Sequence, residues 1–159
     1  MKFLIAGAGA IGAYVGARMA RAGFDVTLFA RGPHLKAMQQ HGVRVRSAEG
    51  DFEAYPRIVG SLEEAGQSDV IILGVKAHSL PQLAPQLTPA IGPETTVVST
   101  QNGIPWWYFQ GIGGPWEGLR LESIDPEGVI SAAIEARRVV GSIVYFSTEI
   151  SEPGVIQHT

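Results

Sequence analysis

The 159-residue sequence has no cysteine, and this absence excludes disulfide bonds and thiolate chemistry. A chain without cysteine suits a reducing compartment, so we expect a cytoplasmic protein. Charged residues are scarce at 17%, the net charge is −3 and no basic run occurs, which argues against a general nucleic-acid-binding protein. The apolar runs are far shorter than the roughly 20 residues that a membrane helix needs, and the first residues lack the pattern of a signal peptide.

The chain also lacks a recognisable metal site. Its four histidines are scattered without the spacing of metal ligands, so we expect surface or capping roles for His34, His41, His78 and His158. Hydrophobic residues make up 45% of the sequence, which is typical of one globular domain with its own core. The composition therefore predicts a single domain over residues 1–159 that binds no metal.

Glycine, in contrast, is abundant with 20 residues, and three of the glycines form a GxGxxG motif near the start of the chain. The motif follows an apolar stretch over residues 2–6, expected to be a buried strand, and it opens a segment with helical spacing of apolar residues. Its residues are Gly7, Ala8, Gly9, Ala10, Ile11 and Gly12. In such motifs the first glycine permits a tight turn, the second leaves room for a pyrophosphate and the third lets the helix approach the strand. Because the helix N-terminus also offers free N–H groups, the motif predicts a dinucleotide site, with a purely structural glycine turn as the alternative.

The end of the second expected strand indicates which dinucleotide binds. NAD-binding folds usually place an acidic residue there to bond the ribose 2′-hydroxyl. Here residues 25–29 are followed by Ala30 and Arg31, without a carboxylate. A guanidinium can hold a 2′-phosphate through two hydrogen bonds, so Arg31 favours NADP over NAD, the alternative being a solvated surface arginine.

Strands and helices alternate along most of the sequence, which predicts an α/β domain of Rossmann type: a doubly wound, mostly parallel sheet with helices on both faces. The expected strands cover residues 2–6, 25–29, 43–46, 52–58 (pairing back on 43–46 as a hairpin), 70–75, 95–100, 139–146 and 155–158. The expected helices begin near residue 11 and at residues 33, 61, 80 and 125; a capping box starts the third, prolines make the fourth irregular, and Asp125 caps the last, which runs to about residue 137.

Two polar residues follow strands of the expected sheet at the edge where ligands bind to such folds. Lys76 comes directly after residues 70–75, and Asn102 comes two residues after 95–100. A lysine there can meet a phosphate or a carboxylate, and an asparagine can bond a ribose or an amide. The alternatives are a solvated lysine and a turn asparagine, because Asn-Gly favours tight turns by itself.

Taken together, these motifs resemble the N-terminal domain of the ketopantoate reductases (2-dehydropantoate 2-reductases). The resemblance is carried by the glycine motif, by residues 25–28 with Arg31, by Val75-Lys76-Ala77, by residues 101–104 and by residues 153–158. It covers nearly the whole chain except the looser segment 106–138, which resembles an insertion found in some members.

The resemblance implies an NADPH-dependent reduction of 2-dehydropantoate, a 2-keto acid, to pantoate on the route to pantothenate and coenzyme A. The glycine motif would carry the pyrophosphate and Arg31 the 2′-phosphate, with Lys76 near the cofactor and Asn102 between nicotinamide and substrate. Ser147 falls roughly where the family touches the cofactor. Family members continue into a helical second domain that supplies the general-acid lysine, so we expect this sequence to be the cofactor-binding half and to be inactive alone.

Two further expectations concern surfaces. A missing second domain predicts exposed apolar surface, for which the aromatic residues 106–109 are candidates, the alternative being simple core packing. An exposed cluster would favour self-association. We also expect residues 155–158 to fray as a sheet edge close to the chain end.

Two other functions remain open from the sequence. One is a nucleotide-sensing regulatory module without catalysis, although such modules typically carry an acidic residue where Arg31 stands. The other is an NADP-linked reductase of a different 2-keto acid, which the first domain cannot distinguish.

Overall fold

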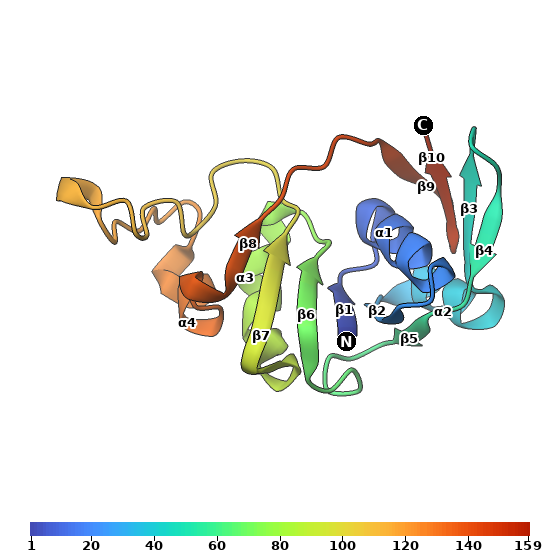
Figure 1. Ribbon diagram of the computed structural model, residues 1–159, viewed down its shortest axis with the longest axis horizontal. Helices are drawn as coiled ribbons and strands as arrows, with labels where there is room; N and C mark the ends of the chain where they lie inside the picture. Colours follow the sequence, from blue (N-terminus) through green and yellow to red (C-terminus); the bar gives the residue numbers. More distant parts are fainter.

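The protein, described here by a computed structural model of residues 1–159, places helix α1 (Ala10–Arg21) between two β-sheets (Figure 1). The larger sheet has six strands and occupies the centre of the molecule, with β8 at one edge. The smaller sheet has four strands and lies beyond α1. This arrangement covers α1 on both sides.

The six strands of the larger sheet are all parallel, in the order β5-β2-β1-β6-β7-β8. The strand order reverses between β1 and β6, and in open parallel sheets ligands bind at this switch point. The strands are β1 (Lys2–Ala6), β2 (Asp25–Phe29), β5 (Arg57–Val59), β6 (Ser68–Leu73), β7 (Ile91–Ser99) and β8 (Val139–Gly141). The predicted doubly wound α/β fold is therefore confirmed.

Helices cover both faces of this sheet, which explains why its central strands are continuously apolar. One face packs against α3 (Leu80–Leu83), the 3₁₀ helix η2 (Ala84–Ala90) and α4 (Val129–Ala133). The other face packs against α1 and Met38 of α2 (Gly32–His41). The expected irregularity of the helix after residue 80 is confirmed, since prolines divide it into α3 and η2.

The smaller sheet was not expected as a separate unit. Its order is β4-β3-β10-β9, and its strands are β3 (Val43–Ser47), β4 (Phe52–Ala54), β9 (Thr148–Glu152) and β10 (Val155–His158). The hairpin expected between residues 43–46 and 52–58 is confirmed for β3 and β4, which pair antiparallel, but residues 57–59 leave it as β5 and join the larger sheet. The idea that residues 155–158 form an edge is wrong, since β10 lies between β3 and β9 and buries Val155 and Ile156 completely.

Two predicted elements after residue 120 are shorter than expected. The helix from Asp125 breaks up into η4 (Pro126–Gly128), α4 and η5 (Ala136–Arg138). The break follows from the left-handed backbone of Glu127 and Gly128, with φ of 55° and 74°. The strand expected over residues 139–146 stops at Gly141, because its only neighbour, β7, ends at Ser99.

Only one of the two backbone hydrogen bonds of the predicted capping box at Ser61 forms, and no helix follows it. The Ser61 hydroxyl accepts from the backbone N–H of Glu64 at 3.4 Å, but residues 61–65 make only turns before Gly66, which has φ of 67°. Two short 3₁₀ helices complete the fold, η1 (Ala77–Ser79) and η3 (Gly114–Trp116). None of the helices combines the length and the apolar character needed to cross a membrane.

Candidate functional site

The glycine motif forms the turn between β1 and α1 at the switch point of the larger sheet. The turn is fixed by backbone hydrogen bonds from Ala8 N–H to the Phe29 carbonyl at 2.7 Å and from Ala13 N–H to the Gly9 carbonyl at 2.8 Å. Gly7 has φ of 108°, and a Cβ atom there would collide with Val75. A Cβ atom at Gly12 would collide with the backbone carbonyl of Gly7. The fold itself therefore requires glycine at the first and third positions of the motif.

Gly9, the middle glycine, is not required by the packing of the protein. It is the N-cap of α1 with an ordinary φ of −71°, and an added Cβ would lie 3.7 Å from the Gly74 carbonyl, a normal contact. No side chain caps α1, and no acidic residue occupies its first turn. The turn thus offers free N–H groups beside a residue without a side chain, which is the form of a phosphate cradle.

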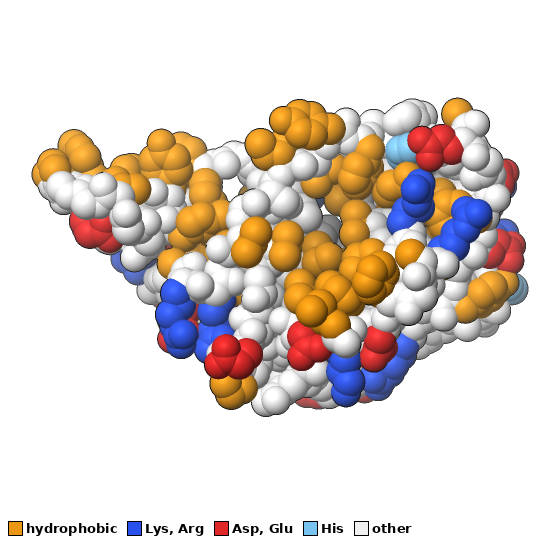
Figure 2. All heavy atoms as spheres, in the orientation of Figure 1, with side chains coloured by type: hydrophobic (Ala, Val, Ile, Leu, Met, Phe, Trp, Pro, Cys, Tyr) orange, Lys and Arg blue, Asp and Glu red, His pale blue; other side chains and the backbone are white.

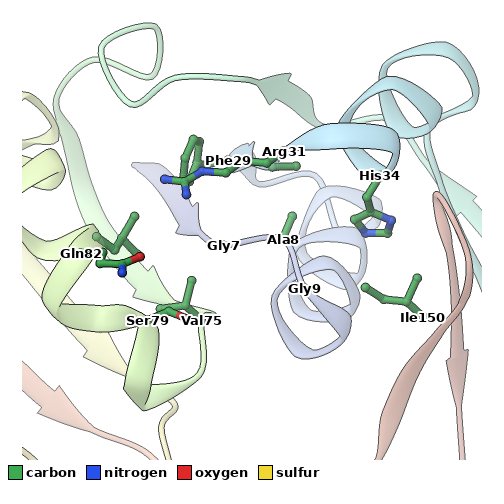
Figure 3. A pocket seen from close by; sticks show the side chains of 12 residues that line it. Gly7, Ala8, Gly9, Phe29, Arg31, His34, Val75, Ser79, Gln82 and Ile150 are labelled. Atoms are coloured by element: carbon green, nitrogen blue, oxygen red, sulfur yellow. The ribbon is translucent and has the colours of Figure 1, made fainter.

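A cavity of about 280 Å³ lies over this turn (Figure 3). Figure 3 shows His34 and Ile150 on one side of the turn, and Val75, Ser79 and Gln82 on the other. The end of β2 closes the cavity with Phe29, Ala30 and Arg31. The cavity therefore joins the glycine turn and the end of the second strand, which the sequence motifs connect, and adds the start of α2, which they do not.

Arg31 lines the same cavity as the glycine turn. Its guanidinium lies over the Phe29 ring, 5.0 Å from the ring centroid, and Nη2 donates to Gln86 Oε1 at 3.2 Å. No carboxylate pairs with it, and the side chain is exposed. A cation held in place by an aromatic ring, with no carboxylate partner, can accept an anionic group of a ligand.

Asn102 and Lys76 are not among the residues that line the cavity over the glycine turn. Asn102 lines a second cavity of about 460 Å³ beside Trp106, formed by the loop after β7, η1, α3 and the start of α4. Lys76 is exposed, with no side-chain hydrogen bond or ion pair, and stands between Val75 of the first cavity and Ala77 of the second. The structure thus places Asn102 in the second cavity, whereas Lys76 itself lines neither.

Ser147 does not join either cavity. It is exposed just before β9, and its backbone carbonyl accepts from Thr159 N–H at 3.1 Å. The aromatic segment is also divided. Trp106 is only 7% exposed and packs in the core, whereas Tyr108 is 54% exposed. Of the two alternatives for residues 106–109, core packing therefore holds for Trp106.

His34 is a cavity residue that the sequence analysis missed. It was expected on the surface or as a cap, yet it is half-buried in the first turn of α2, and its Nδ1 accepts from Gly154 N–H at 2.9 Å. Burial lowers the pKa of His34, and the nearby Ala8 carbonyl opposes this shift. The one sequence feature that could have indicated a site role is its place in the first turn of an expected helix, three residues after Arg31, because helix N-termini often form part of phosphate sites.

The parallel sheet, its switch point and the glycine turn beneath a cavity define the class of Rossmann-type dinucleotide-binding domains. Within that class the chain belongs to the ketopantoate reductase family PanE/ApbA, whose sequence profile matches residues 3–107.

Individual relatives agree with this membership. A 2-dehydropantoate 2-reductase of Mesorhizobium japonicum is 46% identical over 99% of this chain and 49% of its own length. A crystal structure from Ralstonia solanacearum, assigned to the ketopantoate reductases, has a TM-score of 0.92 and 40% identity over 99% of this chain and 49% of its own. The chain thus spans about half the length of the curated relatives it matches.

A more distant structure shows the same fold. D-mandelate dehydrogenase with NADH and anilino(oxo)acetate has a TM-score of 0.79 at 24% identity, over 100% of this chain and 46% of its own. At this identity the likeness concerns the arrangement of strands and helices alone.

Proposed function

We propose that this chain is the cofactor-binding domain of an NADPH-dependent 2-dehydropantoate 2-reductase, which converts the 2-keto acid 2-dehydropantoate into pantoate. The observation that carries the proposal is that Arg31 and Gly9 line one cavity in a member of the ketopantoate reductase family. The stability of the fold does not require a glycine at position 9 or an arginine at position 31. Gly9 has room for a side chain, and Arg31 has no carboxylate partner.

Two parts of the first cavity have a role in this proposal. The glycine turn, Gly7 to Gly12, holds the pyrophosphate on its free N–H groups, and Arg31 holds the 2′-phosphate that distinguishes NADP from NAD. The bound nicotinamide supplies the hydride for the ketone carbon. Two negatively charged groups can bind in this cavity without repulsion from a carboxylate, because none is among the residues that line it.

The remaining predicted residues lie outside the lining of the first cavity. Lys76 is flanked in the sequence by Val75 of the first cavity and Ala77 of the second, and we assign it a contact with the cofactor; Asn102, in the second cavity, can bond ribose, amide or substrate. Ser147 stays a family-based prediction of a cofactor contact, and its exposed position outside both cavities gives it no support. Segment 106–138 stays a predicted insertion.

Ketone reduction also requires a proton donor for the oxygen that becomes charged. The family resemblance assigns this role to a lysine of a helical domain, and Lys76 is not that residue. We therefore expect the 159-residue chain, assayed by itself, to bind NADPH but to reduce little or no 2-dehydropantoate.

The test is a titration of the chain with NADPH and with NADH, followed by calorimetry, for wild type, Arg31→Ala and a control, Arg137→Ala. The control removes an exposed arginine that pairs with Glu135 near the outer edge of the sheet. We expect wild type and the control to bind NADPH more tightly than NADH. Arg31→Ala should abolish this preference, because NADPH loses about 1.5–3 kcal/mol of binding free energy with the contact to its 2′-phosphate.

Other results would contradict the proposal in distinct ways. Equal or tighter binding of NADH by wild type would remove NADP as the cofactor and favour a sensing module. An unchanged preference in Arg31→Ala would assign the 2′-phosphate to another residue.

Self-association through apolar surface is also part of the proposal, at a different place from the one first expected. The connection between β8 and β9 carries Ile143, 74% exposed, and Tyr145, 91% exposed. Figure 2 shows hydrophobic side chains gathered along the upper edge of the molecule, over this connection. Exposed apolar groups of this size favour contact with another apolar surface. A cytoplasmic location and the absence of nucleic-acid partners stay predictions of the sequence.

A further inference from the structure

His34, in the first turn of α2, receives a hydrogen bond from the smaller sheet and also lines the cavity over the glycine turn. Gly154, in the turn between β9 and β10, donates its backbone N–H to His34 Nδ1 at 2.9 Å. The turn lies directly on α2, since a Cβ atom at Gly154 would approach Ala37 Cβ to 3.1 Å. His34 therefore receives its orientation from the smaller sheet, although its ring lines the cavity over the glycine turn (Figure 3).

The hydrogen bond from Gly154 also fixes where the proton of the imidazole lies. Because Nδ1 accepts a hydrogen bond, the neutral ring carries its proton on Nε2. Nε2 is buried and has no hydrogen-bond partner. The Ala8 carbonyl lies close enough to influence the ring but does not complete a hydrogen bond to it. A buried N–H donor is thus held beside the glycine turn without an acceptor, an arrangement that calls for an explanation.

The peptide group between Ala8 and Gly9 is the one that this donor can affect. Its carbonyl, on Ala8, faces the histidine side of the cavity, and its N–H, on Gly9, has no backbone partner. A hydrogen bond to an amide carbonyl polarises the group and strengthens its N–H as a donor. Donation from His34 to Ala8 would therefore improve Gly9 N–H as a ligand for phosphate.

We propose that His34 is a positioning residue that couples the smaller sheet to phosphate binding: when a pyrophosphate settles on the glycine turn, His34 Nε2–H bonds to the Ala8 carbonyl. The inference rests on the proposed function, because it presumes a dinucleotide over the turn. Coupling of this kind is reciprocal, so the ligand must in turn stabilise the hydrogen bond between Gly154 and His34.

Two substitutions separate the two nitrogens of the ring. His34→Asn keeps an acceptor near the position of Nδ1 for Gly154 but removes the donor at Nε2. His34→Gln can place a donor near the position of Nε2. His41→Asn, at the last residue of the same helix, is the matched control. ADP is the probe, because it carries the pyrophosphate without the 2′-phosphate assigned to Arg31.

The measurements are ADP and NADPH affinity by calorimetry, melting temperature without ligand, and the exchange rate of the Gly154 amide with and without ADP. We expect His34→Asn to bind both ligands roughly tenfold more weakly, a coupling factor in the usual range. His34→Gln should recover most of the loss, and His41→Asn should bind as wild type does. In wild type, ADP should slow exchange of the Gly154 amide, and in His34→Asn it should not.

The outcomes distinguish this inference from the proposed function. Binding of ADP by His34→Asn as tight as by wild type, or exchange of Gly154 that ADP does not change in wild type, would overturn the role of His34 and leave the cofactor proposal standing. A His34→Gln variant that binds as weakly as His34→Asn, despite an unchanged melting temperature, would do the same. Failure of wild type to bind either ligand would overturn both.

Discussion

At the scale of single residues, Gly9 and Gly12 belong to one motif but are glycine for different reasons. A Cβ atom at Gly12 collides with the Gly7 carbonyl, whereas one at Gly9 fits beside Gly74. We expect Gly12→Ala to lower the free energy of unfolding by about 1–3 kcal/mol through overpacking. Gly9→Ala should change it by less than about 1 kcal/mol but weaken dinucleotide binding about tenfold, or about 1.4 kcal/mol.

Urea denaturation and calorimetric titration of the two variants, each against wild type, measure both effects. The proposal would lose its main support if Gly9→Ala bound the dinucleotide as tightly as wild type. Strong destabilisation by Gly9→Ala would instead mean that the fold requires this glycine as well.

The second prediction at this scale concerns the pH dependence of stability. Burial lowers the pKa of His34 in the folded protein, despite the opposing effect of the Ala8 carbonyl, and its ordinary value is 6.5. Between the folded pKa and 6.5, the unfolded chain binds more protons than the folded chain. The stability from neutral His34 is therefore complete above the ordinary pKa, falls as the pH drops through this window, and levels off below the folded pKa.

Protonation would also turn Nδ1 into a donor facing the Gly154 N–H, which gives the loss a structural cause. We expect His34→Asn to flatten the decrease in the free energy of unfolding between neutral and mildly acidic pH, as measured by urea denaturation at a series of pH values. A variant with the same slope as wild type would place the responsible proton elsewhere.

At the scale of elements, the short helix α4 depends on one buried carboxylate. Asp125 is 1% exposed and accepts from Ile130 N–H at 2.7 Å and from Ser131 N–H at 3.2 Å. The side chains of Ile130 and Ile134 pack in the hydrophobic core. We expect Asp125→Ala to lower the free energy of unfolding by about 1–2 kcal/mol. Asp125→Asn, which retains one acceptor, should lose less, and equal urea midpoints for all three proteins would show that Asp125 does not stabilise α4.

Elements with a continuous apolar pattern were predicted well, whereas elements that depend on partners were not. The sequence located β1, β2 and the core of β6 because burial on both faces leaves a local pattern. It missed β9, whose residues are mostly exposed, and misjudged β10, since pairing with β3 joins residues more than a hundred positions apart. The length of β8 was likewise set by where β7 ends.

At the scale of the whole molecule, the exposed side chains of the β8–β9 connection predict self-association. We expect wild type to show a sedimentation coefficient that rises with concentration, and the double variant Ile143→Ser, Tyr145→Ser to lose this rise. Tyr55→Ser is the control, because Tyr55 is 72% exposed in the connection between β4 and β5. A sedimentation coefficient of wild type that does not change with concentration would contradict the prediction.

The candidate site was also only partly predictable. The glycine motif and Arg31 could be found because each follows directly from a strand, so a local motif fixes their place in the sheet. His34 could not be assigned, because its role depends on the β9–β10 turn, 120 positions away in the sequence. Asn102 was expected near the same ligand, but the structure gives it a separate cavity, and Lys76 lines neither cavity.

The amino-acid sequence by itself determined the parallel α/β fold, the glycine turn and the cation at the end of the second strand, since these rest on patterns within a few neighbouring residues. Tertiary structure alone decided that a second sheet covers α1 and that packing requires glycine at positions 7 and 12 but not at position 9. It also decided that Nε2 of His34 is buried without a hydrogen-bond partner. The physical reason is that hydrogen bonds and close contacts between distant segments have no local signature. They exist only after the apolar strands have brought those segments together.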